Sequence, residues 1–209
     1  MSRMAKHQDH CVACRTFAVT KIVLTFRVVY FRVMFQFSSR NVSVAGEEDV
    51  PALRRLLDSA YRGESSRQGW TSEAHLIAGE SRTNEHELFT IMRMPGSVFV
   101  VYRGEQGELI GCLNLQTHQH RVYLGMFSVS PTLQGGGIGK ILLQSADEWS
   151  RQQSATSIYM TVISARSELI DWYIRHGYRD TGERNKFEEN AVSGRHLRNL
   201  EFMTLEKEL

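Results

Sequence analysis

The chain has 209 residues, of which 42% are hydrophobic and 23% charged, values that allow a sizeable buried core and exclude an intrinsically disordered protein. Its formal net charge of +2 is too small to indicate a nucleic-acid-binding surface by itself, and we expect no nucleic-acid partner. Three cysteines, an odd number, exclude a closed set of disulfides and favour a reducing compartment, so we expect a cytoplasmic protein.

The first 40 residues differ in composition from the rest of the chain. They hold seven Lys and Arg against the single acid Asp9. Three interpretations stay open for this extension: an organellar targeting presequence, an extra strand, or a segment with no role. We therefore expect an N-terminal extension at residues 1–40 and one folded domain at residues 41–209.

An apolar stretch within this extension, residues 19–37, raises the question of a membrane span. Lys21, Arg27 and Arg32 interrupt it, so that no run of about 18 uncharged residues remains. We expect no stable membrane insertion.

Four potential zinc ligands lie close together near the N-terminus, namely His7, His10, Cys11 and Cys14. Their spacing lacks the long intervening stretch of a zinc finger and leaves a very tight loop. We expect a tail with incidental His and Cys, and no metal site.

From residue 41 onward, the hydrophobic pattern alternates between strands and helices. The segment 47–61 places five apolar residues on one helical face: Val50, Leu53, Leu56, Leu57 and Ala60. Thr83 or Asn84 can cap the helix that follows. In chain order, the predicted strands are 42–44, 97–102, 109–117, 122–129, 157–163 and about 200–205. The predicted helices are 47–61, 71–78, 85–93, 137–153 and 167–176, and residues 62–67 are predicted to form a polar loop.

A glycine-rich turn separates the strand that ends at Val129 from the helix that starts near Gly137. Glycine removes the Cβ that would block a close approach to the backbone, and a helix N-terminus carries partial positive charge. A phosphate or pyrophosphate is therefore the expected guest of the turn 134–140.

Two nucleotide-binding motifs can be tested against the spacing of this turn. The Walker A motif fails because Gln134 stands where its first glycine is required and Ile141 stands where Ser or Thr is required. The dinucleotide fingerprint fails because the residue three positions after Gly137 is Lys140 and not glycine.

The pattern that fits is Q/R-x-x-G-x-G/A, met by Gln134, Gly137 and Gly139. A second block follows at residues 165–178, where ARSELIDWYIRHGY is similar to N-x-x-A-x-x-x-Y-x-x-x-G-F/Y. Together these blocks resemble the GCN5-related N-acetyltransferase (GNAT) superfamily over about 170 residues. The arrangement AYRGE…GWT-E in the region 60–73 resembles an uncharacterised subgroup of it.

The resemblance implies an α/β fold with a mixed sheet of about six to seven strands flanked by helices, in which the fourth and fifth strands splay apart. It implies acetyl-CoA as co-substrate and no metal. Main-chain groups of the fourth strand would pair with pantetheine and the acetyl carbonyl, and amides of the glycine-rich turn would hold the pyrophosphate. The expected cofactor-binding residues are Phe127, Ser128, Val129, Gln134, Gly135, Gly136, Gly137, Ile138, Gly139, Lys140 and Arg166.

The resemblance also places a general acid at Tyr173, which would protonate the departing CoA thiolate. The general base is open, because the strand 122–129 has no carboxylate and Thr161 stands where one branch of the superfamily carries Glu. Candidates for the base are Glu73, His118, His120 or a chain of water molecules. Arg166 replaces the Asn that contacts the cofactor in many members, and either meets a CoA phosphate or is a surface charge.

The acceptor is expected to meet the segment 62–73, for which the alternative is a helix-capping loop with a packed Trp. Arg62, Glu64 and Trp70 are the candidate substrate-binding residues. Glu64 or Glu73 would suit a cationic amine, and Arg62 or Arg82 a carboxylate.

The function expected from these residues is transfer of an acetyl group from acetyl-CoA to a primary amine by direct attack, the amine belonging to a small molecule or a peptide. A catalytically reduced acyl-CoA-binding sensor module is the alternative. We expect a monomer or a homodimer.

Overall fold

The computed structural model describes residues 35–79, 81–189 and 194–209. The chain divides into two units, 1–36 and 37–209, and the second holds the fold presented below. Residues 1–34 lie outside the described part of the chain. Our interpretations of the N-terminal extension up to that position, including the cluster from His7 to Cys14, therefore remain predictions. No helix in the described part of the chain has the length and apolarity needed to cross a bilayer.

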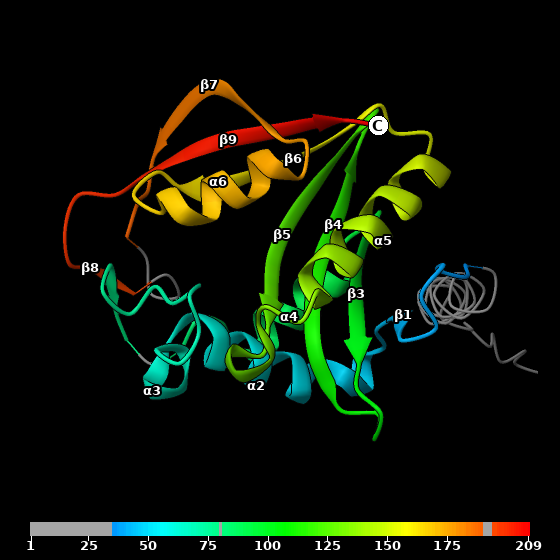
Figure 1. The fold of residues 1–209 in the computed structure, drawn as a ribbon, viewed down its shortest axis with the longest axis horizontal. Coiled ribbons are helices and arrows are strands. Elements are labelled where there is room, and N and C mark those ends of the chain that lie inside the picture. Colours follow the sequence, from blue (N-terminus) through cyan, green and yellow to red (C-terminus); the bar gives the residue numbers. More distant parts are fainter. Residues whose placement is uncertain (1–34, 80, 190–193) are drawn as a thin grey trace, which may run out of the picture. The chain divides into compact units, whose positions relative to one another are not determined.

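A seven-stranded mixed sheet forms the centre of the second unit, in the order β1-β3-β4-β5-β6-β9-β7 (Figure 1). Its strands are β1 (Val42–Val44), β3 (Ser97–Arg103), β4 (Leu109–His118), β5 (Arg121–Val129), β6 (Ser157–Ile163), β7 (Arg179–Lys186) and β9 (Glu201–Glu208). Every neighbouring pair is antiparallel except β5 and β6, which are parallel. A second sheet pairs β2 (Ile77–Ala78) with β8 (Arg195–His196). The predicted α/β class and mixed sheet are confirmed.

Helices cover both faces of this sheet (Figure 1). They are η1 (Glu47–Asp49), α2 (Val50–Tyr61), α3 (Gly63–Ser66), α4 (Glu85–Arg93), η2 (Pro131–Leu133), α5 (Ile138–Gln152) and α6 (Ser167–Arg175). Successive residues of β4 show the two faces, since Cys112 packs in the core cluster of α2 whereas a Cβ on Gly111 would meet Leu142 and Ile138 of α5.

Helix α2 forms as its hydrophobic pattern predicts. Its five predicted core residues, from Val50 to Ala60, are all buried, and they pack with Phe99 and Val101 of β3. Helix α4 begins at the predicted cap, where the Asn84 side chain accepts a hydrogen bond from the Glu87 amide at 2.8 Å.

The sheet opens between β5 and β6. These two strands pair only where Arg121–Tyr123 face Ser157–Tyr159, and β5 then carries a bulge at Met126, whose φ is 47°. The main chain from Phe127 to Val129 therefore has β4 on one side and no strand of the described chain on the other. Strands β5 and β6 are the predicted fourth and fifth strands, which were expected to splay apart.

Two local predictions are wrong, and one strand was not predicted. Residues 71–78 form turns and β2 instead of a helix, and the predicted polar loop 62–67 contains the short helix α3. Distant contacts hold the start of the segment 71–78, where the Thr71 hydroxyl accepts a hydrogen bond from Gln134 and the Thr71 carbonyl accepts one from Arg166. Strand β7 has no counterpart in the prediction, because all its side chains are exposed and it lacks an apolar alternation.

Candidate functional site

A cavity of about 590 Å³ lies beside the end of β5 that has separated from β6. Four segments line it: the end of β5, the glycine-rich turn into α5, helix α6, and the region from the last residue of α2, Tyr61, to Thr71. These segments are distant in sequence, and the divergence of two strands brings them around one space.

Nine of the eleven predicted cofactor-binding residues line this cavity, namely Phe127, Val129, Gln134, Gly135, Gly137, Ile138, Gly139, Lys140 and Arg166. Ser128 is buried and Gly136 is exposed, and both lie outside the lining. Trp70 and Tyr173 also line the cavity, whereas Arg62, Glu64 and Glu73 do not.

The glycine-rich turn leaves its backbone accessible. Gly135 and Gly137 both have a φ of 85°, a left-handed conformation that L side chains rarely adopt. Apart from the glycine itself and its two chain neighbours, no described atom lies within 4 Å of the position that a Cβ would take at either glycine. Gly137 is the N-cap of α5, a helix of 15 residues. The turn therefore offers amides and a helix N-terminus to an anion, as a CoA pyrophosphate requires.

Gln134 connects this turn to the loop after α3. Its side-chain nitrogen donates to the Thr71 hydroxyl at 2.8 Å and to the Val129 carbonyl at 3.1 Å. Its side-chain oxygen accepts from the Trp70 amide at 3.0 Å. A single side chain thus fixes the expected donor site and the expected acceptor loop to each other.

An aromatic group that was not predicted from the sequence lines the cavity. Trp172 of α6 lies 6.0 Å from Phe127, 6.3 Å from Trp70 and 4.1 Å from His176, measured between ring centroids. Its ring also lies 3.5 Å from the Cβ position of Gly139. The spacing of Trp172 and His176, four residues apart on a predicted helix, was the available signal.

Tyr173 follows on the same helix and faces the open end of β5. Its ring lies 6.2 Å from that of Phe127, and its hydroxyl makes no hydrogen bond to any described residue. Burial raises the pKa of this phenol well above its ordinary value, and the nearby Arg166 only partly offsets the effect. The phenol therefore keeps its proton at neutral pH.

Tyr61, the last residue of α2, is a second tyrosine of the cavity and was missed by the sequence analysis. Its hydroxyl donates to the Phe127 carbonyl at 2.8 Å. Burial raises the pKa of this phenol to about 12, with a further rise from Glu73 and opposing effects from Arg82 and Arg166. Through this hydrogen bond, the end of α2 contacts the end of β5.

Glu73 lies in a buried ionic cluster next to the cavity. One of its oxygens is 3.0 Å from the Arg166 guanidinium and the other is 3.5 Å from that of Arg62. All three side chains are at most 8% exposed. Arg166 is therefore not a surface charge, and it holds Glu73 and the Thr71 carbonyl.

The other base candidates lie elsewhere. His118 ends β4 and pairs with Arg121, the first residue of β5, and His120 directly precedes Arg121. Arg121 lies six residues before Phe127, a separation of roughly 20 Å at about 3.3 Å per strand residue. Within the ranges that the structure describes, no group of three or more His, Cys, Asp or Glu side chains could hold a metal ion.

The acetyltransferase (GNAT) family model matches residues 51–178, more than half of the chain. The chain belongs to this family. This GNAT domain thus groups with proteins that transfer acyl groups from acyl-CoA. A search of curated proteins finds no match to the sequence.

Solved structures share the fold of this GNAT domain. The ribosomal-protein-alanine N-acetyltransferase from Brucella melitensis has a TM-score of 0.59 at 20% identity, covering 80% of this chain and 99% of that one. The ribosomal-protein-S18-alanine N-acetyltransferase from Escherichia coli has a TM-score of 0.59 at 14% identity, covering 80% and 92%. A GNAT acetyltransferase from Staphylococcus aureus Mu50 has a TM-score of 0.59 at 15% identity, covering 81% and 98%. At these identities the likeness concerns the fold alone.

Proposed function

We propose that the protein transfers an acetyl group from acetyl-CoA to a primary amine by direct attack. The observation that carries this proposal is the cavity itself, which is lined by the glycine-rich turn, the end of β5 that does not pair with β6, and Tyr173. The turn supplies amides for the pyrophosphate, and the strand edge supplies main-chain groups for pantetheine.

The reaction balances with the groups available. The amine nitrogen bonds to the thioester carbonyl carbon, the C–S bond breaks, and the CoA sulfur takes the proton of Tyr173. The proton that the amine loses goes to a base, which we propose to be a water chain. Two arginines hold Glu73, and both histidine candidates lie at the far end of β5.

Direct attack is supported by the state of Cys112, the cysteine of the described chain. Its thiol is buried, donates to the Met126 carbonyl at 3.5 Å, and has its pKa raised to about 12 by burial. A thiol in this state is a poor nucleophile, so an acetyl-cysteine intermediate at Cys112 is disfavoured.

Two measurements on one preparation test the proposal. Isothermal titration with acetyl-CoA measures donor binding, and release of free CoA thiol in the presence of a panel of primary amines measures transfer. We expect saturable binding and CoA release with at least one class of amine. Failure to bind acetyl-CoA would contradict the proposal.

A sensor that binds acyl-CoA without transfer is the second candidate. It is favoured by Arg166, which stands where many members carry Asn and which is engaged with Glu73 and Thr71. Binding without CoA release for every amine in the panel would support the sensor.

A further inference from the structure

Two buried guanidinium groups pair with one buried carboxylate on the Tyr61 side of the site, and a third guanidinium lies close to one of them. The charge of Glu73 is balanced by Arg62 and Arg166, whose side chains are both buried with it. Arg82 adds a third positive charge, close enough to lower the pKa of the Arg62 guanidinium, although burial is the larger cause of that shift. With Asp58, which also acts on Arg62, three positive charges stand against two negative ones among these described side chains.

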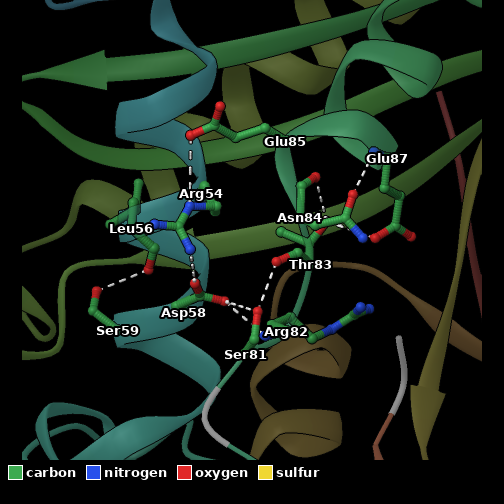
Figure 2. Close-up of polar contacts among 10 residues, drawn as sticks. All are labelled: Arg54, Leu56, Asp58, Ser59, Ser81, Arg82, Thr83, Asn84, Glu85 and Glu87. Carbon is green, nitrogen blue, oxygen red and sulfur yellow. Dashed lines mark hydrogen bonds and ion pairs between the residues drawn. The ribbon is translucent and has the colours of Figure 1, made fainter. Parts of the chain in front are cut away.

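The main chain of Arg82 is held by a hydrogen bond, whereas its guanidinium has no polar partner among the described residues. Asp58 accepts hydrogen bonds from the Arg82 amide at 2.7 Å and from the Ser81 hydroxyl at 3.3 Å, and its other oxygen pairs with Arg54 at 3.5 Å. Figure 2 shows the Arg82 guanidinium pointing away from Asp58. Across the described residues, this guanidinium has no hydrogen bond and no ion pair.

Tyr61 connects Arg82 to the open end of β5. The Arg82 guanidinium carbon lies over the Tyr61 ring, 5.5 Å from its centroid, and the hydroxyl of the same ring donates to the Phe127 carbonyl. Stacking on an aromatic ring leaves the edge of a guanidinium free to donate hydrogen bonds. Arg82 and the main chain expected to hold the acetyl group are thus separated by one tyrosine side chain.

We propose that the acceptor is an amino carboxylate, a primary amine with a carboxylate one or two carbons from its nitrogen, and that Arg82 binds this carboxylate. The inference rests on the proposed function, because it places the amine at the acetyl group. A planar guanidinium pairs with a carboxylate through two parallel hydrogen bonds, which would orient the amine toward β5. Glu73 does not compete for a cationic acceptor, since its charge is already neutralised.

The first experiment compares the standard free L-amino acids with their α-carboxamides. The amide keeps the amine and the side chain and lacks only the carboxylate. Its amine is also less basic, so at neutral pH intrinsic reactivity favours the amide and any preference for the acid reports recognition. We expect kcat/KM for the best amino acid to exceed that for its amide by about ten- to hundredfold.

Variants assign this preference to a residue. Arg82→Gln should lower kcat/KM for the amino acid by about ten- to hundredfold and leave the amide within about twofold, with the KM for acetyl-CoA unchanged. Arg54→Gln is the matched control, because Arg54 is also held near Asp58 but pairs with Asp58 and Glu85 (Figure 2). It should retain the preference for the acid. Arg82→Lys should restore part of the loss.

A binding measurement separates failure of this inference from failure of the proposed function. Isothermal titration of the CoA-saturated protein with the same amino acids should show binding that Arg82→Gln weakens at least about tenfold, whether or not acetyl transfer occurs. Three results would overturn the inference: no amino acid binds, wild type treats acids and amides alike, or Arg82→Gln impairs acids and amides equally. If amino acids bind but no CoA is released, only the proposed acetyl-transfer activity is contradicted.

Discussion

We propose that Tyr173 delivers a proton rather than binds the donor; its hydroxyl has no hydrogen-bond partner in the described part of the chain. Tyr173→Phe should lower kcat about a hundredfold or more and leave acetyl-CoA affinity within about twofold. Steady-state kinetics and calorimetry measure the two effects. Because burial raises the pKa of this phenol, ionisation of Tyr173 should not reduce the kcat of the wild type at any pH up to about 10.

The control for this variant is Tyr123→Phe. The Tyr123 hydroxyl contacts that of Thr161 where β5 and β6 still pair, so its loss should leave kcat nearly unchanged. Unchanged turnover in Tyr173→Phe would remove Tyr173 from the mechanism.

Glu73 is expected to stabilise the fold, because it separates two buried guanidinium groups. Glu73→Gln would remove the carboxylate that both guanidinium groups share and should lower the free energy of unfolding by roughly 3–5 kcal/mol, measured by urea denaturation. Glu64→Gln is the control, since the exposed Glu64 pairs with Arg67 at 3.9 Å and should change stability by at most about 1 kcal/mol. A Glu73→Gln protein of normal stability and lost turnover would instead support Glu73 as the base.

At the scale of elements, the region between β2 and α4 anchors Arg82. Asp58 binds the start of this segment and Asn84 caps α4 at its end (Figure 2). Asn84→Ala should cost about 1 kcal/mol and lower Tm by roughly 2–4 °C, measured by thermal denaturation. Thr90→Ala in the same helix removes a γ-methyl group and a hydroxyl that donates to the His86 carbonyl, replaces Thr by a better helix former, and should not lower Tm. Equal effects of the two substitutions would contradict the capping role.

Elements whose own pattern specifies them were predictable from the sequence. Helix α2 and strand β6 follow from apolar spacing, and the helix start at Asn84 follows from its side chain. The segment 71–78 was not predictable, because contacts to Gln134 and Arg166, more than 60 residues away, determine its conformation. Local propensity is a weak guide where such distant contacts prevail.

The same distinction applies to the site. The glycine-rich turn could be identified because its function depends on the backbone, and the sequence shows directly where side chains are missing. Tyr61 could not be identified, and Arg82 could not be chosen over Arg62 as the carboxylate-binding candidate. Their positions arise from the approach of α2 to β5 and of the segment after β2 to α2. The Arg166–Glu73 ion pair joins residues 93 positions apart and follows only from the tertiary fold.

At the scale of the whole molecule, buried phenols and a buried thiol link stability to alkaline pH. Burial raises the pKa of Tyr61 and of Cys112 to about 12, and raises those of Tyr173 and Tyr178 as well. In the unfolded chain these groups ionise near pH 10 for tyrosine and near 8.5 for cysteine. Above these values the unfolded state binds fewer protons than the native state, so stability falls as pH rises.

We therefore expect Tm to be steady near neutral pH and to fall progressively between about pH 9 and pH 12. Thermal denaturation at a series of pH values measures this decline. Tyr61→Phe should make it shallower, because one ionisable group is removed. A Tm that stays constant up to pH 11 would contradict the burial of these groups.

The central claim, that acetyl-CoA binds at the glycine-rich turn beside β5, is tested most directly by isothermal titration of two glycine variants with acetyl-CoA. Gly137 and Gly182 have φ values of 85° and 84°, and, apart from the glycine itself and its two chain neighbours, neither has a described atom within 4 Å of its Cβ position. Substitution by Glu therefore imposes similar backbone strain at both sites, but only Gly137 lines the cavity. We predict that Gly137→Glu abolishes acetyl-CoA binding while Gly182→Glu binds as the wild type does. Equal affinity of the two folded variants would contradict the placement of the donor site.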